Sequence, residues 1–102
     1  MTGITSFSFD WDSDKARENL REHGVSFPEA ASVFYDPLAA AVEDQEHGFG
    51  ERRFVTLGCS DIGRLLVVVH TGEELESNVI HVRIISARKV TQRERRHYEE
   101  IR

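Results

Sequence analysis

The stretch Arg83-Ile-Ile-Ser-Ala-Arg-Lys-Val-Thr-Gln-Arg-Glu-Arg-Arg-His-Tyr98 combines a buried-strand pattern, a helix start signal and six of the thirteen Lys and Arg residues of this 102-residue chain. Residues 83–102 hold seven Lys and Arg against three Glu, a charge of +4, whereas residues 1–82 hold six against fifteen acidic residues, a charge of −9. The two parts sum to the net charge of −5. A basic region in an acidic chain indicates a local anion site, for which phosphate is the first candidate.

The pattern in and before this stretch predicts a strand followed by a helix. Residues 79–85 alternate, with Ile80 and Val82 on one face and His81 and Arg83 on the other. Thr91-Gln-Arg-Glu94 is a capping box, in which each side chain bonds the other residue's backbone N–H. We therefore expect a strand over residues 79–85 and a final helix ending near residue 101.

Further upstream, the pattern predicts more strands. Residues 65–71 are a nearly continuous β-branched run, which is typical of a central strand, and residues 54–59 predict its neighbour. Ser60-Asp-Ile-Gly63 between them has the composition of a hairpin turn. Residues 38–42 fit a short strand, residues 43–50 an acidic loop and residues 72–78 a polar connection.

The N-terminal third predicts a strand and two helices. Apolar residues alternate over residues 7–11, as in a strand with one buried face. Asp12 is a helix N-cap, Gly24 ends that helix, and Ser26-Phe-Pro-Glu29 is a capping box for the next helix. The second helix is expected to end by Asp36, because the residue before a proline avoids helical geometry.

This order of elements predicts an α+β fold. The expected topology is β-α-α-β-β-β(-β)-α, with a curved, mostly antiparallel sheet and helices mainly on one face. An apolar fraction of 39% supports one modest core. We expect a small single domain over residues 1–102.

Composition also predicts a cytoplasmic protein without membrane contact. The longest apolar run, residues 65–69, is too short to cross a bilayer, and the first residues show no leader-like pattern. The single Cys59 has no partner for an intramolecular disulfide, which favours a reducing compartment.

Three polar residues of the first helix share one face. Lys15, Asn19 and His23 follow each other at intervals of four, so all three can face a common ligand. The alternative is a solvated face on which His23 interacts with the negative end of the helix dipole.

Arginines near the last strand are the sharper phosphate candidates. Arg83 is expected on the strand and Arg88 just past its end, leading to the helix N-terminus at Thr91, where free N–H groups attract anions. Arg64 and Arg53 join them if neighbouring strands have the matching register. The alternative is that each arginine pairs with a nearby carboxylate.

The last helix carries a basic face. Arg93 and His97 are four residues apart, and Tyr98 adds an aromatic ring, a combination that suits phosphate contact and base stacking. Three further pairs at the same spacing (Glu94 with Tyr98, Arg95 with Glu99, Arg96 with Glu100) support a plain solvated helix as the alternative.

The chain has the residue types for cleaving RNA without a metal. A base must take the 2′-OH proton, an acid must protonate the 5′ oxygen, and cations must neutralise the phosphorane. The acidic segment at residues 43–47 lacks zinc-ligand spacing, and His70 alternates with apolar residues as a core histidine does. No metal or other cofactor is expected.

The order and spacing of these features resemble the BrnT family of bacterial toxins. The matching residues, spread over residues 7–100, are Phe9-Asp-Trp-Asp12, Lys15, Asn19, His23-Gly-Val25, Phe27, Glu29-Ala30, Asp36-Pro37, residues 51–54, Gly58, residues 65–71, Arg83-Ile-Ile-Ser-Ala-Arg88, Thr91, Arg93-Glu94-Arg95 and Tyr98.

The resemblance implies a RelE-like fold and a ribonuclease toxin that blocks translation. It implies catalytic roles for Arg64, Arg83 and Arg88, and it matches Lys15, His23 and Glu51 to family positions. It also implies neutralisation by a ribbon-helix-helix antitoxin, BrnA, in a complex for which a heterotetramer is one arrangement, with operator DNA bound through the antitoxin. Two departures are the long connection at residues 72–78 and the net charge of −5.

We therefore expect a metal-independent endoribonuclease of a type II toxin–antitoxin system. Arg64, Arg83 and Arg88 would hold the scissile phosphate, His23 or Glu51 would act as base, and His97 or Tyr98 as acid. Lys15, Arg53 and Arg93 would bind substrate. The alternatives are a non-enzymatic module whose basic last helix docks an acidic partner, and direct DNA binding by that helix, for which no helix-turn-helix pair is present.

Overall fold

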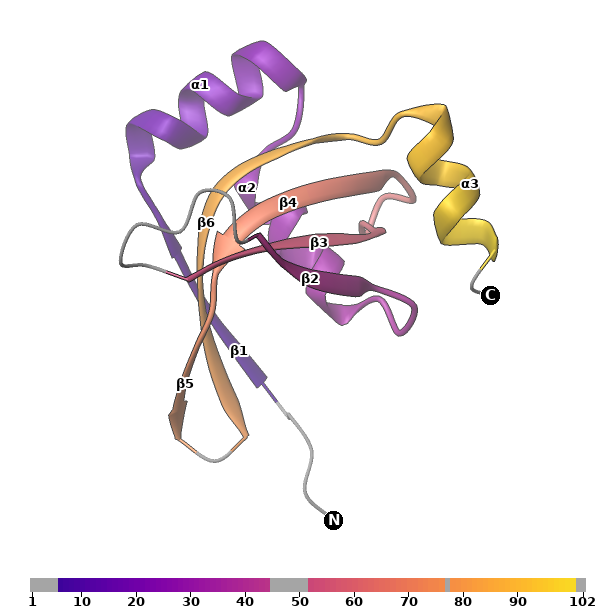
Figure 1. The fold of residues 1–102 in the computed structure, drawn as a ribbon. Coiled ribbons are helices and arrows are strands. Elements are labelled where there is room, and N and C mark those ends of the chain that lie inside the picture. The colour runs from indigo at the N-terminus through magenta and orange to yellow at the C-terminus, as the bar shows by residue number, and fades with distance from the viewer. Residues whose placement is uncertain (1–5, 45–51, 77, 101–102) are drawn as a thin grey trace.

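The structure, a computed structural model, describes residues 6–44, 52–76 and 78–100 (Figure 1). Its elements follow in the order β1 (Ser6–Trp11), α1 (Ser13–His23), α2 (Phe27–Ser32), the 3-10 turn η1 (Val33–Tyr35), β2 (Ala40–Asp44), β3 (Arg53–Cys59), β4 (Leu65–Thr71), β5 (Glu73–Glu76), β6 (Val79–Lys89) and α3 (Gln92–Glu100).

All described strands belong to one sheet, in the order β1-β6-β4-β3-β2, with β5 paired beside β4 on the long strand β6. β1 runs parallel to β6, and the other pairs are antiparallel. The predicted α+β fold with a mostly antiparallel sheet is thus confirmed.

Two expectations about the last strands were wrong. The expected polar connection contains β5, because its backbone pairs with residues 79–81 of β6, and an edge strand tolerates charged side chains. β6 also continues to Lys89, because β4 pairs with it as far as Leu66↔Lys89 after a bulge at Ile85. Arg88 therefore lies within the strand and not past its end.

The predicted helix boundaries rest on the capping groups read from the sequence. The Asp12 carboxylate accepts hydrogen bonds from the backbone N–H groups of residues 14 and 15, and Gly24 has the left-handed φ of 69° that ends α1. Ser26 caps α2, and Thr91 and Glu94 cap α3 reciprocally. These local contacts place the start of each of the three helices and the end of α1.

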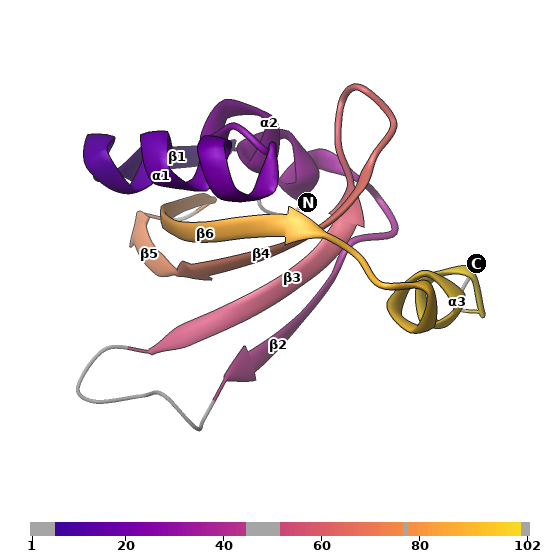
Figure 2. The same cartoon turned by 90° about the horizontal axis from the view of Figure 1, so that it is seen from above.

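One face of the sheet, here called the helical face, packs against α1 and α2 (Figure 2). The fully buried side chains there are Val25, Phe27, Ala30, Val33, Leu66, Val68, Val82, Ile84 and Ala87, flanked by the aromatic residues of β1. We call the opposite face the open face, because neither α1 nor α2 covers it (Figure 2).

α3 lies beside the end of the sheet (Figures 1 and 2), and its residue Tyr98 bonds to Asp36. The buried Tyr98 donates a hydrogen bond of 2.7 Å to the Asp36 carboxylate, which also accepts one from the Cys59 N–H. This contact orients α3 so that part of it borders the open face. No helix within the described residues has the length and hydropathy needed to cross a membrane.

Candidate functional site

The strand registers arrange the open face in three rows of side chains. Paired residues of neighbouring strands point to the same side of a sheet, so each register step gives one row. The first row is Asp44, Arg53, Thr71, Arg83 and Asp10; the second is Val42, Val55, Val69 and Ser86; the third is Ala40, Leu57, Val67 and Arg88. The open face thus has polar groups at both ends and an aliphatic strip between them.

The first polar group, the β1–β6 cluster, comprises Ser8, Asp10, His81 and Arg83. The parallel register places Ser8 beside His81 and Asp10 beside Arg83. Arg83 Nη1 lies 3.2 Å from the Asp10 carboxylate, and His81 Nε2 lies 3.4 Å from its other oxygen. His81 Nδ1 is 3.2 Å from the Ser8 hydroxyl. All four side chains remain accessible to solvent at the surface.

The second polar group, the α3 cluster, comprises Arg88, Arg93, Glu94 and His97. Arg88 and Glu94 form a bidentate ion pair with two contacts of 2.9 Å. Hydrogen bonds from Arg88 are the main cause that lowers the pKa of Glu94 to about 2.

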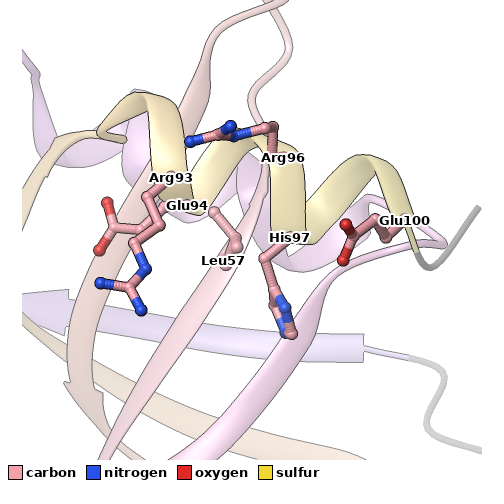
Figure 3. A pocket seen from close by; sticks show the side chains of 6 residues that line it. All are labelled: Leu57, Arg93, Glu94, Arg96, His97 and Glu100. Atoms are coloured by element: carbon pink, nitrogen blue, oxygen red, sulfur yellow. The ribbon is translucent and has the colours of Figure 1, made fainter.

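A pocket of about 520 Å³ lies between α3 and the sheet at the α3 cluster. Figure 3 shows the side chains of Arg93 and His97 extending from α3 past Leu57, a residue of the third row. The pocket is therefore continuous with the open face, and it presents cationic and titratable groups at the rim of that face.

Arg64 lies on the helical face, at a pocket that it lines together with Lys89 and Arg95. It forms a bidentate ion pair with the buried Glu29 carboxylate, one contact being 2.9 Å, and donates a bond of 3.0 Å to the Gly24 carbonyl. Ser60 donates a third bond to Glu29. The hydrogen bond from Arg64 is the main cause that lowers the pKa of Glu29. Arg64 therefore neutralises a buried acid and does not converge with Arg83 and Arg88.

The three polar residues of α1 do not share a common ligand site. Asn19 is buried, and its amide bonds the N–H and carbonyl of Ala87 and the carbonyl of Val25. Lys15 and His23 are exposed on α1, which packs on the helical face. Asn19 therefore joins α1 to β6 and has no amide group left for a ligand.

Tyr98 and Glu51 are considered separately from the candidates that lie on or beside the open face. Tyr98 is 6% exposed, and its hydroxyl donates a hydrogen bond to the Asp36 carboxylate. Glu51 lies outside the described residues. Arg53, Arg83, Arg88, Arg93 and His97 do lie on or beside the open face.

Sequence reasoning missed the partners of Arg83. Alternation placed His81 on the same face as Arg83, but Ser8 and Asp10 belong to a strand more than 70 residues away. Only the parallel pairing of β1 with β6 brings them together.

His70 is a core histidine, as its position predicted. Its ring is buried between Thr56 and the Thr71 carbonyl, and burial lowers its pKa. Among the described residues, no three His, Cys, Asp or Glu side chains are grouped as metal ligands.

Comparison with protein families identifies the chain. Residues 11–94 match the family model described as "Ribonuclease toxin, BrnT, of type II toxin-antitoxin system". The chain belongs to the BrnT family. The match includes Arg53, Arg64, Arg83 and Arg88, whereas Ser8, Asp10 and His97 lie outside the matched segment.

A solved structure supports the same fold. The crystal structure of the Brucella abortus ribonuclease toxin BrnT, at 1.1 Å resolution, aligns with a TM-score of 0.57 and 19% identity. The alignment covers 86% of this chain and 100% of the Brucella chain. A search of curated proteins gave no match. The open face described above is therefore a surface on a BrnT-type fold.

Proposed function

We propose that this BrnT-family chain is a metal-independent endoribonuclease that binds RNA across the open face and cleaves it by attack of the 2′-OH. The observation that carries the proposal is Arg83, whose guanidinium is half exposed on that face. Arg53 lies in the same row, two strands away. The row offers two cations to a nucleic-acid backbone.

The contacts that each arginine already makes indicate how readily it can bind a phosphate. Arg83 makes one ion-pair contact of 3.2 Å with Asp10, which leaves other guanidinium donors for phosphate oxygens. Arg88 has both terminal nitrogens on Glu94, and one of them also bonds the Lys89 carbonyl. A phosphate would have to displace Glu94 to bind Arg88 in the same way. Arg83 is therefore the stronger candidate for the scissile phosphate.

The aliphatic strip suits the bases of a single-stranded RNA. Val42 is exposed, and Val55 and Val69 are half buried beside it. Bases lying on this strip would place their phosphates near the arginines of the flanking rows, while Arg93 and His97 extend the surface along α3. This local arrangement supports RNA binding despite the net charge of −5.

The proposal includes the biological setting implied by the family. The toxin would inhibit translation in the cytoplasm, and a BrnA-like ribbon-helix-helix antitoxin would neutralise it, with operator DNA bound through the antitoxin. An antitoxin that covers the open face would block RNA and also shield its aliphatic strip. Lys15, His23 and Glu51 remain predictions from the family resemblance.

Cleavage by the purified protein tests the enzyme. We expect RNA to be cut in the presence of EDTA, and Arg83→Ala to slow cleavage by about 10²- to 10³-fold, as loss of one charge-stabilising donor does. Arg17→Ala is the matched control, because Arg17 also pairs with an aspartate on an exposed surface but lies on α1. Equal loss of activity in both variants would contradict a site at Arg83.

The same experiment tests the alternative of a non-enzymatic module. The basic side chains of Arg93 and Arg96 along α3 favour that alternative, since they would also dock an acidic protein. Absence of RNA cleavage by the unmodified protein, with and without ribosomes, would exclude the ribonuclease proposal and leave the module.

A further inference from the structure

Both ring nitrogens of His81, a histidine of the open face, lie close to polar side chains of β1. Ser8 lies at Nδ1 and Asp10 at Nε2, at 3.2 and 3.4 Å. Its side chain is 27% exposed, so it is held in place yet remains open to solvent. Arg83 lies two residues along the same strand, on the same side of the sheet.

The neighbours of His81 determine which nitrogen is free to take a proton. A carboxylate only accepts hydrogen bonds, so the Asp10 contact favours a hydrogen on Nε2. Nδ1 then carries the lone pair and accepts from the Ser8 hydroxyl. A substrate hydroxyl that replaces Ser8 at Nδ1 would meet a base whose cationic form is stabilised by Asp10.

We propose that His81 is the general base of RNA cleavage in this protein, positioned by Asp10 and acting on a phosphate held by Arg83. This inference rests on the proposed function. The 2′-O–H bond breaks and its proton passes to His81 Nδ1, while the 2′ oxygen forms a bond to phosphorus. The P–O5′ bond breaks, and the 5′ oxygen takes a proton from solvent water. The products are a 2′,3′-cyclic phosphate and a 5′-hydroxyl, and the resulting hydroxide removes the proton from His81.

The geometry separates His81 from the histidine expected as acid. His81 and Arg88 are seven residues apart on β6, which corresponds to about 23 Å at roughly 3.3 Å per residue. His97 borders the Arg88 end of the open face, at the pocket containing Leu57. One phosphate therefore cannot touch both rings, and His97 acts on a different part of the RNA.

The charged groups around His81 set the expected pH dependence. Asp10 faces it from β1, Arg83 from β6, and Glu73 is its register partner on β5. The base must be neutral to act, so the cleavage rate should rise with pH until His81 has lost its proton.

His81→Asn and His97→Asn are the decisive pair of variants, assayed on one RNA from pH 5 to pH 9. We expect His81→Asn to lower kcat by about 10²- to 10⁴-fold and to abolish the rising limb, with KM within about twofold. His97→Asn should raise KM and keep the limb. A His81→Asn enzyme that keeps both the limb and kcat overturns the inference.

Two further readouts exclude a purely structural role for His81. Asp10→Asn should lower kcat with KM nearly unchanged, because the imidazole loses the carboxylate that holds its Nε2 hydrogen. Added imidazole should restore part of the activity of His81→Ala. Failure of both would overturn the inference even if His81→Asn proved unfolded. Lack of cleavage by the unmodified protein would instead overturn the proposed function itself.

Discussion

Each face of the sheet carries an ion pair between an arginine and a carboxylate, but the two pairs differ in their exposure to solvent. On the helical face, Arg64 pairs with Glu29, and their side chains are 31% and 9% exposed. On the open face, Arg83 pairs with Asp10, and the corresponding values are 45% and 48%. The residue types are alike, but the carboxylate is buried in the first pair and half exposed in the second.

This difference shows that burial, more than residue type, separates structural arginines from candidate catalytic ones. A buried carboxylate without a partner is costly, so Arg64 is required for the fold. A half-exposed pair gains little stability because water screens it, so Arg83 is not needed for the fold. The following substitutions test this contrast, from the largest expected effect on stability to the smallest.

Arg64→Ala should cause the largest loss of unfolding free energy among these variants, because it leaves the buried Glu29 carboxylate without its cation. Urea denaturation measures this change, and Arg83→Ala should change the value by less than about 0.5 kcal/mol. An Arg64→Ala protein that is as stable as the original yet fails to cleave RNA would place Arg64 in the chemistry and break the contrast.

Asn19→Ala should cost about 2–3 kcal/mol. The substitution removes three hydrogen bonds and leaves the Ala87 N–H, the Ala87 carbonyl and the Val25 carbonyl unpaired in a buried site. Chemical denaturation checks it, with the exposed neighbour Glu18→Ala as control. A loss equal to that of the control would mean that the amide does not join α1 to β6.

The elements themselves followed from local chemistry in the sequence. Capping residues such as Asp12 and Ser26 marked helix starts through contacts within three residues. The β-branched run of β4 marked a central strand. Errors arose where strand pairing mattered more than composition. The charged residues of β5 form a strand because β6 pairs with them. β6 itself continues beyond its alternating pattern, past the bulge near Ile85.

The candidate site was predicted only in part, because it depends on register. The strand pattern placed His81 and Arg83 on one face, but their partner Asp10 required knowledge of a parallel pairing across the whole chain. The sequence also gave no sign that Arg64 turns toward Glu29, because that contact forms only when α2 packs on the sheet. Residue type and spacing thus identified the candidate cations, whereas tertiary packing determined which of them pair with buried acids and which lie on the open face.

Tyr98→Phe should lower the free energy of unfolding by about 1 kcal/mol, the typical contribution of one hydrogen bond. It removes the contact between α3 and Asp36 while keeping the buried ring. Thermal denaturation measures the loss, and the exposed Tyr35→Phe is the control. Because α3 borders the open face, RNA should also bind more weakly; a destabilised variant with unchanged RNA affinity would show that α3 lies outside the RNA-binding surface.

Glu94→Gln should lower the stability of the protein near neutral pH by about 1 kcal/mol and make its stability less sensitive to acid. The pKa of Glu94 in the folded chain is about 2, below its ordinary value of 4.5, chiefly because of the hydrogen bonds from Arg88. A lowered pKa means that the ionised form stabilises the fold, so this contribution is present above about pH 4.5 and is lost as the pH falls toward 2. Solvent screening of the partly exposed pair limits it to about 1 kcal/mol. The free energy of unfolding, measured by denaturation between pH 2 and pH 7, should therefore vary less with pH in Glu94→Gln than in Glu99→Gln on the same helix. An equal pH dependence in the two variants would show that Arg88 is not bound to Glu94 and is as free as Arg83 to hold a phosphate.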